Sequence, residues 1–269
     1  MNSEPKRADP LLSVSDIQLQ FGGLRVLASV SFAVERGEIF SIIGPNGAGK
    51  TSLLNCISGR YQPDSGSILF DHTELTRCSI NARAALGLGR TFQNLALFEH
   101  MSVLDNVLVG RHHLMRSNVL DGIFYWLGRA RTDEARHRQV VLETLEKLDL
   151  MSVADSSAGV LSYGLQKRVE LARAMALQPS LILLDEPMAG MNREEKDAMA
   201  RQIIDLNVQS GLTVVMIEHD VGIVREISDR VIVLDFGEKI AEGEPETVLQ
   251  DSHVREAYLG MATESAHGV

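Results

Sequence analysis

The sequence is poor in cysteine and aromatic residues. Its 269 residues include two cysteines, Cys56 and Cys78, which do not form a metal-binding pair. This usage is typical of a reducing compartment rather than of a disulfide-stabilised secreted domain. Aromatic residues make up 5% of the chain, so we expect an interior packed mainly with Val, Ile, Leu and Ala. The length suits one large domain with a subsidiary lobe.

Positive charge and long apolar runs are also scarce. The chain has 36 acidic and 26 basic residues and a net charge of −10, which argues against a nucleic acid partner. Residues 1–10 are polar and charged, so we expect no signal peptide. The longest apolar candidate, residues 122–128, falls far short of the roughly 18 residues of a membrane span.

A glycine-rich stretch at Gly44–Thr51 organises the chain. It has the form G-x-x-x-x-G-K-[ST], follows the apolar run 39–43 and precedes a helix-like segment. Its glycines let successive backbone N–H groups point into one concavity, and the following helix adds its positive dipole end. This pattern predicts a nucleotide triphosphate site, with Lys50 on the phosphates and Thr51 on Mg²⁺. The candidate phosphate-binding residues are Gly44, Pro45, Asn46, Gly47, Ala48, Gly49, Lys50, Thr51 and Ser52.

Apolar patterning predicts an α/β fold with a mostly parallel sheet. Short segments before the loop predict strands that pair antiparallel with their sequence neighbours, because no helix fits between them. After residue 161, apolar runs without alternation alternate with helical patterns, as in a sheet covered by helices. The expected strands are 14–21, 26–34, 38–43, 67–70, 181–185, 213–217 and 231–234. The expected helices are 49–58, 81–86 (ended by 87–89), most of 102–150, 166–177, 194–208, 221–227, 245–250 and 253–259.

Two further segments complete the predicted nucleotide site. Asp185 and Glu186 follow the apolar run 181–184, so Asp185 can bind Mg²⁺ and Glu186 can polarise the attacking water. Ser162 caps a second helix start, and its backbone together with that of Gly164 forms another anion site. One nucleotide hardly needs two such helix starts from one chain. We therefore expect a head-to-tail dimer in which Ser162 and Gly164 of one subunit close over the γ-phosphate held by the other.

With these motifs, the chain resembles the ATPase subunit of an ABC transporter over nearly its whole length. Gly44–Thr51 matches Walker A, residues 181–186 match Walker B with its catalytic glutamate, and residues 161–166 resemble the ABC signature. The resemblance implies an α/β P-loop NTPase core with a mostly parallel sheet, an antiparallel β subdomain and a helical subdomain. It also implies ATP and Mg²⁺ as cofactors.

The same resemblance implies roles for three further side chains. Gln93 stands where the family has a glutamine that contacts the metal and reports to the membrane subunits. His219 matches the switch histidine that touches the γ-phosphate, and Phe21 matches the aromatic residue that stacks on adenine. The implied catalytic residues are therefore Glu186, His219 and Gln93, and the implied metal residues are Thr51, Gln93 and Asp185.

The resemblance also implies how the chain is divided and which proteins it meets. Residues 11–92 and 160–240 would form the core with its β subdomain, 93–159 the helical subdomain and 241–269 a helical tail. The expected partners are a second ATPase subunit, identical or paralogous, and two permease subunits. A periplasmic or extracellular solute-binding protein would act indirectly. This places the chain on the cytoplasmic face of the membrane.

Finer features resemble the subunits that serve branched-chain amino acid importers. They are Phe21–Leu24, Gly89–Asn94, the helical stretch 111–150, Ala189–Asn192, Ile217–Asp220 and Ala257–Gly260. Importers of urea, amides or small carboxylates share much of this pattern and remain alternatives. An exporter ATPase, a soluble ABC ATPase acting on DNA or ribosomes, and a non-catalytic regulatory subunit are further alternatives.

The signature and the D-loop depart from the family pattern. Leu165 stands where the signature has an amide expected near the partner nucleotide, and Asn192 stands where most of the family has Asp. Ser162 and Gly164 are retained, so the contact with the γ-phosphate is expected to survive.

Overall fold

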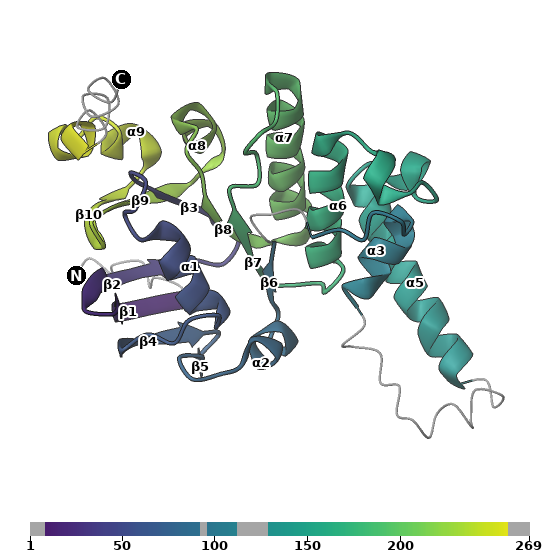
Figure 1. Cartoon of the computed structure of the whole chain (residues 1–269), viewed down its shortest axis with the longest axis horizontal. Coiled ribbons are helices and arrows are strands. Elements are labelled where there is room, and N and C mark those ends of the chain that lie inside the picture. Colours follow the sequence, from purple (N-terminus) through teal and green to yellow (C-terminus); the bar gives the residue numbers. More distant parts are fainter. Residues whose placement is uncertain (1–8, 92–95, 112–128, 258–269) are drawn as a thin grey trace, which may run out of the picture.

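The computed structural model describes residues 9–91, 96–111 and 129–257. Gln93 and residues 112–128, which hold much of the predicted helical stretch, lie outside the described residues. Within them, a six-stranded sheet has the order β10-β9-β3-β8-β7-β6, in which all neighbours except β10 and β9 are parallel. These strands are β3 (Ile39–Ile43), β6 (Leu88–Arg90), β7 (Leu181–Asp185), β8 (Thr213–Ile217), β9 (Arg230–Asp235) and β10 (Glu238–Gly243). The predicted mostly parallel sheet is confirmed (Figure 1).

A second, antiparallel sheet of four strands has the order β2-β1-β4-β5. It contains β1 (Leu12–Phe21), β2 (Leu24–Val34), β4 (Ser65–Phe70) and β5 (Thr73–Glu74). The prediction that every early strand pairs antiparallel with its neighbour is wrong for β3, which pairs in parallel with β8 and β9. All five residues of β3 are buried, so the strand requires cover on both faces, and a central place in the larger sheet provides it.

The helices cover the larger sheet and extend into a helical region at one end of the molecule (Figure 1). They are α1 (Lys50–Ser58), α2 (Ile80–Ala85), α3 (Val103–Val109), α5 (Arg129–Lys147), α6 (Tyr163–Met175), α7 (Arg193–Ser210), α8 (Val221–Ile227) and α9 (Pro245–Val248). Residues 252–257 are also helical.

Three strands were not predicted from the sequence: the two-residue β5 of the smaller sheet and two strands of the larger sheet. Residues 88 and 89, assigned to the end of a helix, form β6 together with Arg90, and residues 238–243 form β10. The predicted helical tail therefore begins as a strand, because β10 continues to Gly243. Both strands lie at edges of the sheet, where β6 is three residues long and β10 has no buried residue, so neither carries a clear apolar pattern.

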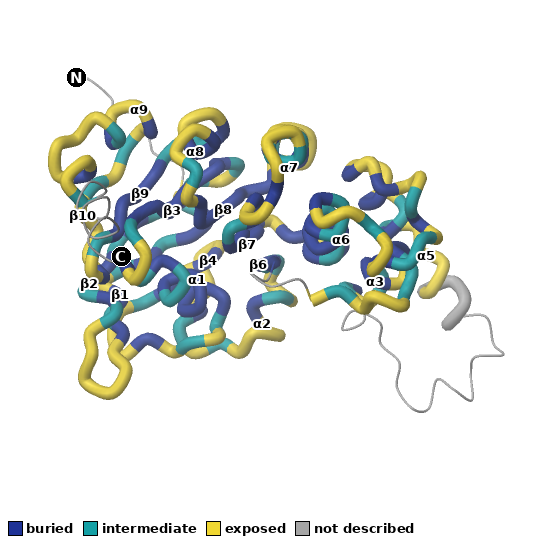
Figure 2. The backbone as a smooth tube through the Cα atoms, turned by 45° about the horizontal axis from the view of Figure 1, so that its top comes forward, coloured by how far each residue is buried: buried dark blue, intermediate teal, exposed yellow. Residues whose placement is uncertain are grey.

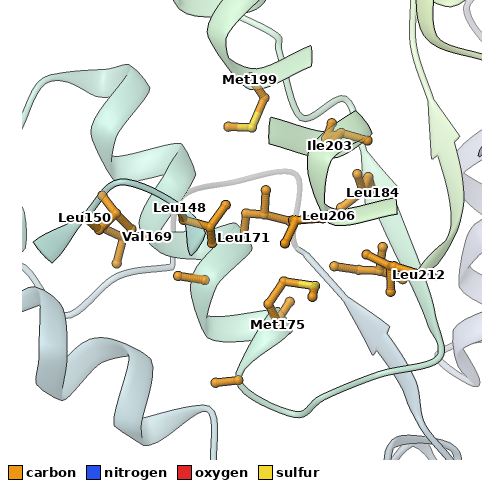
Figure 3. Packing of buried hydrophobic residues seen from close by; sticks show 14 of the residues in the cluster. Leu148, Leu150, Val169, Leu171, Met175, Leu184, Met199, Ile203, Leu206 and Leu212 are labelled. Atoms are coloured by element: carbon orange, nitrogen blue, oxygen red, sulfur yellow. The ribbon is translucent and has the colours of Figure 1, made fainter. Parts of the chain in front are cut away.

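Two large apolar clusters form the core. In one, Leu53, Leu54 and Ile57 of α1 are buried between the two sheets, with Phe40 on the parallel side. The other joins the helical region to the parallel sheet through buried residues of α6 and α7, such as Leu171 and Leu206 (Figure 3). The central strands β3, β8 and β7 are buried along their length (Figure 2). This burial fixes the ends of the three strands relative to one another.

A buried arginine holds the carboxyl end of α1. The Arg83 side chain is 1% exposed and donates hydrogen bonds to four backbone carbonyls. The acceptors are Cys56 (2.7 Å), Ile57 (2.6 Å), Thr76 (3.3 Å) and Cys78 (3.1 Å). The first two belong to the last turn of α1, whose carbonyls lack partners within the helix. Arg83 therefore caps the helix that begins at the glycine-rich loop.

Replacing Arg83 with methionine (Arg83→Met) should lower the free energy of unfolding by about 3 kcal/mol. The reason is that carbonyls such as that of Ile57 would lose the Arg83 donor, at about 1–3 kcal/mol for each group left unsatisfied, although Cys56 O would keep its hydrogen bond from the Gly59 N–H. Urea denaturation measures the change. Arg77→Met is the matched control, because Arg77 is an exposed arginine nearby. Equal stability of the two variants would contradict the capping role.

Candidate functional site

Three parallel strands bring the candidate residues to one edge of the sheet. β3 leads into the glycine-rich loop, β7 into Glu186, and β8 into Glu218 and His219. The register pairs Ile42 with Ile217, and Ile217 with Asp185. Since parallel strands end on the same side, segments far apart in the sequence meet at this edge (Figure 1).

The glycine-rich loop adopts backbone conformations that require glycine. Gly44 has φ 143°, and a Cβ atom there would lie 2.0 Å from the Leu234 carbonyl oxygen. Gly49 has φ 98°, and its Cβ would lie 2.7 Å from the Val26 carbonyl oxygen. α1 starts directly after Gly49, so its first N–H groups and its positive dipole end face the loop.

Lys50 folds back over this loop. Its Nζ donates hydrogen bonds to the carbonyl oxygens of Gly44 (2.7 Å) and Pro45 (2.8 Å), and the side chain is buried. Burial lowers the pKa of the Lys50 ammonium, and the carboxylates of Glu186 and Asp185 oppose that shift. The cation is thus held at the loop by acceptors that an anionic ligand can replace.

A cavity of about 290 Å³ opens at the loop. The residues that line it are Val26, Asn46, Gly47, Ala48, Gly49, Lys50, Thr51, Ser52, Glu186 and His219. In it, His219 Nε2 and Glu186 Oε1 are 2.6 Å apart. Glu186 has φ 50°, an uncommon value for a residue with a side chain and one that often marks functional sites. The structure therefore joins the loop, Glu186 and His219 as the sequence predicts.

Asp185, which directly precedes Glu186 in the chain, is buried and has one unpaired oxygen. The side chain is 1% exposed, and Oδ2 accepts a hydrogen bond from the Arg90 guanidinium at 3.3 Å. Among the described residues, Oδ1 has no hydrogen-bond partner. Burial raises the pKa of the Asp185 carboxyl group, while Arg90 acts in the opposite direction.

The oxygen atoms here fit a magnesium ion. A buried carboxylate oxygen without a partner calls for a ligand, and Thr51 adds a hydroxyl at the cavity wall. No group of three or more His, Cys, Asp or Glu side chains is placed to hold a metal among the described residues. A carboxylate and a hydroxyl oxygen are the kind of donors that Mg²⁺ takes from proteins, and it completes its shell with water and phosphate.

Phe21 is accessible but lies outside the residues that line the cavity. It ends β1, its exposed fraction is 48%, and its ring packs edge-on against Tyr61 at a centroid distance of 5.2 Å. Its register partner is Leu24, and Val26, two residues further along β2, lines the cavity. Phe21 is therefore a half-exposed aromatic residue whose neighbouring strand contributes to the cavity lining.

Ser162 and Gly164 also lie outside the cavity lining of the single chain. The Ser162 side chain caps α6 by accepting a hydrogen bond from the Leu165 backbone N–H at 3.4 Å. Gly164 packs against α7, and a Cβ atom there would lie 2.6 Å from Glu195 Oε1. One chain thus does not bring its own second helix start to its own loop.

The two departures from the family pattern have structural explanations. Leu165 is half-buried and packs against the apolar cluster of the helical region. Asn192 caps α7 in a reciprocal pair, accepting from Glu195 N–H at 3.0 Å while its own N–H donates to Glu195 Oε2 at 3.1 Å. Asn and Asp serve about equally well at such a cap.

Sequence reasoning missed two charged residues of this region. Arg90 contacts Asp185, and Glu218 accepts hydrogen bonds from the backbone N–H groups of Met188 (3.1 Å) and His219 (3.2 Å). Burial raises the pKa of Glu218. The one signal in the sequence was the position of Glu218 at the end of a buried run. Arg90 had none, because its role depends on the pairing of β6 with β7.

Comparison with known proteins agrees with this architecture. A family model described as ABC transporter matches residues 27–189, and one described as branched-chain amino acid ATP-binding cassette transporter matches residues 238–260. The chain is 40% identical to the high-affinity branched-chain amino acid transport ATP-binding protein BraF of Pseudomonas aeruginosa, over 94% of this chain and 99% of that protein. It is 38% identical to LivG of Escherichia coli, a protein with the same description, over 95% and 100%.

Solved structures agree as well. An ATP-binding cassette of an ABC transporter in its ADP conformation superposes with a TM-score of 0.82 at 32% identity, covering 94% of this chain and all of that one. A dimeric bacterial ABC transporter cassette gives a TM-score of 0.72 at 26% identity, covering 87% and 98%. The phosphate loop, the strand ends beside it and these similarities together show that the chain belongs to the ATP-binding subunits of the ABC transporter family.

Proposed function

We propose that this chain binds and hydrolyses ATP to drive an importer of branched-chain or other small amino acids. The observation that carries the proposal is the shared cavity, in which the loop 44–52 meets Glu186 and His219. The amino acid substrate rests on the similarity to BraF and LivG along nearly their whole length. The solute itself would pass through other subunits.

The loop would hold the triphosphate of ATP. Backbone N–H groups at the start of α1 face the phosphates, and the Lys50 ammonium exchanges the carbonyls of Gly44 and Pro45 for phosphate oxygens. Thr51 and Asp185 would hold Mg²⁺, directly or through water. When bound, that ion neutralises charge on the β- and γ-phosphate oxygens. Phe21 would stack on the adenine.

Glu186 and His219 would carry the hydrolytic step. Glu186 orients water for attack on the γ-phosphorus and accepts its proton, while the bond to the β-phosphate oxygen breaks. His219, 2.6 Å from Glu186 Oε1, fixes the direction of that carboxylate and contacts the γ-phosphate. Gln93, outside the described residues, would contact the metal and sense the nucleotide.

The other half of each site would come from a second ATPase subunit, identical or paralogous. Ser162 and Gly164 are absent from the cavity lining of their own chain, and a helix start capped by serine suits an anion. A head-to-tail pair would place them over the partner's γ-phosphate. ATP then closes the pair, and hydrolysis reopens it.

Separate permease subunits would carry the solute across the membrane. No helix in residues 9–91, 96–111 or 129–257 is long and apolar enough to cross a bilayer. The helical subdomain, residues 93–159, would move the permeases with Gln93 at its hinge. The chain would lie on the cytoplasmic face of the membrane, and a solute-binding protein would act on the other side.

Removing the loop cation should strongly weaken nucleotide binding. In Lys50→Ala the phosphates lose charge-assisted hydrogen bonds of about 1.5–3 kcal/mol, so affinity should fall at least about tenfold. Titration with a fluorescent ATP analogue measures this. Lys147→Ala, which alters an exposed lysine at the end of α5, is the control. Unchanged affinity in Lys50→Ala would contradict the central assignment.

Neutralising Glu186 should stop hydrolysis but preserve binding. Glu186→Gln keeps the shape of the side chain and removes the base, so the ATPase rate should fall by about 10²–10⁴-fold. Nucleotide affinity should persist, and sedimentation with ATP should detect a stable closed dimer. The exposed Glu226 supplies the control variant Glu226→Gln. A near-normal rate in Glu186→Gln would remove Glu186 from this role.

Replacing Ser162 with arginine should leave ATP binding by the isolated chain intact but slow ATP hydrolysis by the assembled transporter. Ser162→Arg leaves the chain's own cavity intact, so the isolated chain should bind ATP normally. In the assembled transporter, hydrolysis should fall by at least about tenfold, because the partner's phosphate loses a preorganised donor group. Ser210→Arg, at the exposed end of α7, is the control. Normal turnover by Ser162→Arg would argue against the shared site.

A further inference from the structure

We propose that Arg90 is a positioning residue that fixes one oxygen of Asp185, so that the other is presented to the metal. This inference rests on the proposed function, in which Asp185 helps to hold Mg²⁺. It concerns a side chain that none of the motifs above assigns to the site. Arg90 ends β6, the short edge strand beside β7.

The guanidinium joins two parts of the core. The pairing of β6 with β7 sets Arg90 opposite Leu183, two residues before Asp185. Its Nη2 lies 3.3 Å from Asp185 Oδ2, and its Nη1 donates to Ser58 Oγ at the end of α1. The Arg90 and Asp185 side chains are 12% and 1% exposed, so the contact is largely shielded from water. Ser58 therefore anchors Arg90 independently of Asp185.

The pairing is one-sided. An arginine often forms a bidentate pair with both oxygens of a carboxylate, whereas here one guanidinium nitrogen contacts Oδ2. Oδ1 is buried and has no partner among the described residues. A buried acceptor without a hydrogen-bond partner destabilises the protein, and a ligand that binds the acceptor removes that cost. Arg90 thus restrains the rotation of the carboxylate while leaving one oxygen for coordination.

Arg90 could instead compete with the metal for Asp185, because both are cations near the same carboxylate. The contact with Ser58 argues against it. A guanidinium anchored there keeps its place when Asp185 gains another partner, so Arg90 and the ion can use different oxygens of the same carboxylate. Outer groups that orient metal ligands in this way affect metal affinity by about 10–100-fold.

The test measures the affinity for a fluorescent ATP analogue in Mg²⁺ and in EDTA. Wild-type protein should bind more tightly with Mg²⁺, and the ratio of the two dissociation constants reports the metal's contribution. Arg90→Gln should reduce that ratio by about tenfold. Binding in EDTA should stay within about twofold, because the phosphate loop is unaltered. Arg60→Gln is the matched control, being an exposed arginine whose charge acts on Arg90.

Ser58→Ala distinguishes an effect of the position of the Arg90 guanidinium from an effect of its positive charge. It leaves the Arg90 cation in place but removes its anchor, so the ratio should fall in the same direction by a smaller factor. A wild-type ratio in Ser58→Ala would overturn positioning and leave an effect of charge alone. An unchanged or increased ratio in Arg90→Gln would overturn the inference while the proposed function stands. If wild-type protein failed to bind the nucleotide at all, the proposed function itself would fall.

Discussion

The parallel pairing of β3 with β8 and of β8 with β7 determines where the candidate chemistry lies. Each of these strands is buried along its whole length, so none can slide without exposing apolar residues or breaking the ladder. Their common direction delivers the phosphate loop, Glu186 and His219 to one edge. The distance of 2.6 Å between Glu186 and His219, which are 33 residues apart, is a consequence of this arrangement.

Local patterns explain what could be predicted from the sequence. The strand and helix on either side of the glycine-rich loop, the buried strand 181–185 and the cap at Ser162 depend on residues adjacent in the chain, and the structure has them as predicted. The parallel partners of β3, the strands β6 and β10 and the contact of Arg90 with Asp185 depend on segments distant in sequence. Composition carries no signal for such pairings, since an isolated Gly-Arg step fits a helix end as well as a strand.

The site on one chain is electrostatically incomplete. Lys50 and Arg90 face Asp185 and Glu186, so these four groups roughly balance before any nucleotide binds. A triphosphate and Mg²⁺ would add further negative charge, which the helix start at Ser162 suits. The described cavity of the same chain is not lined by Ser162 or Gly164. Under the proposed function, this balance of charge would favour association with a second subunit once nucleotide is bound.

The capping of α1 by Arg83 has a mechanical consequence. The same guanidinium holds the last turn of the helix and the carbonyls of Thr76 and Cys78, which follow the antiparallel sheet. The far end of α1 and the segment after the smaller sheet are therefore linked through one buried side chain, and moving one relative to the other would first have to break these hydrogen bonds.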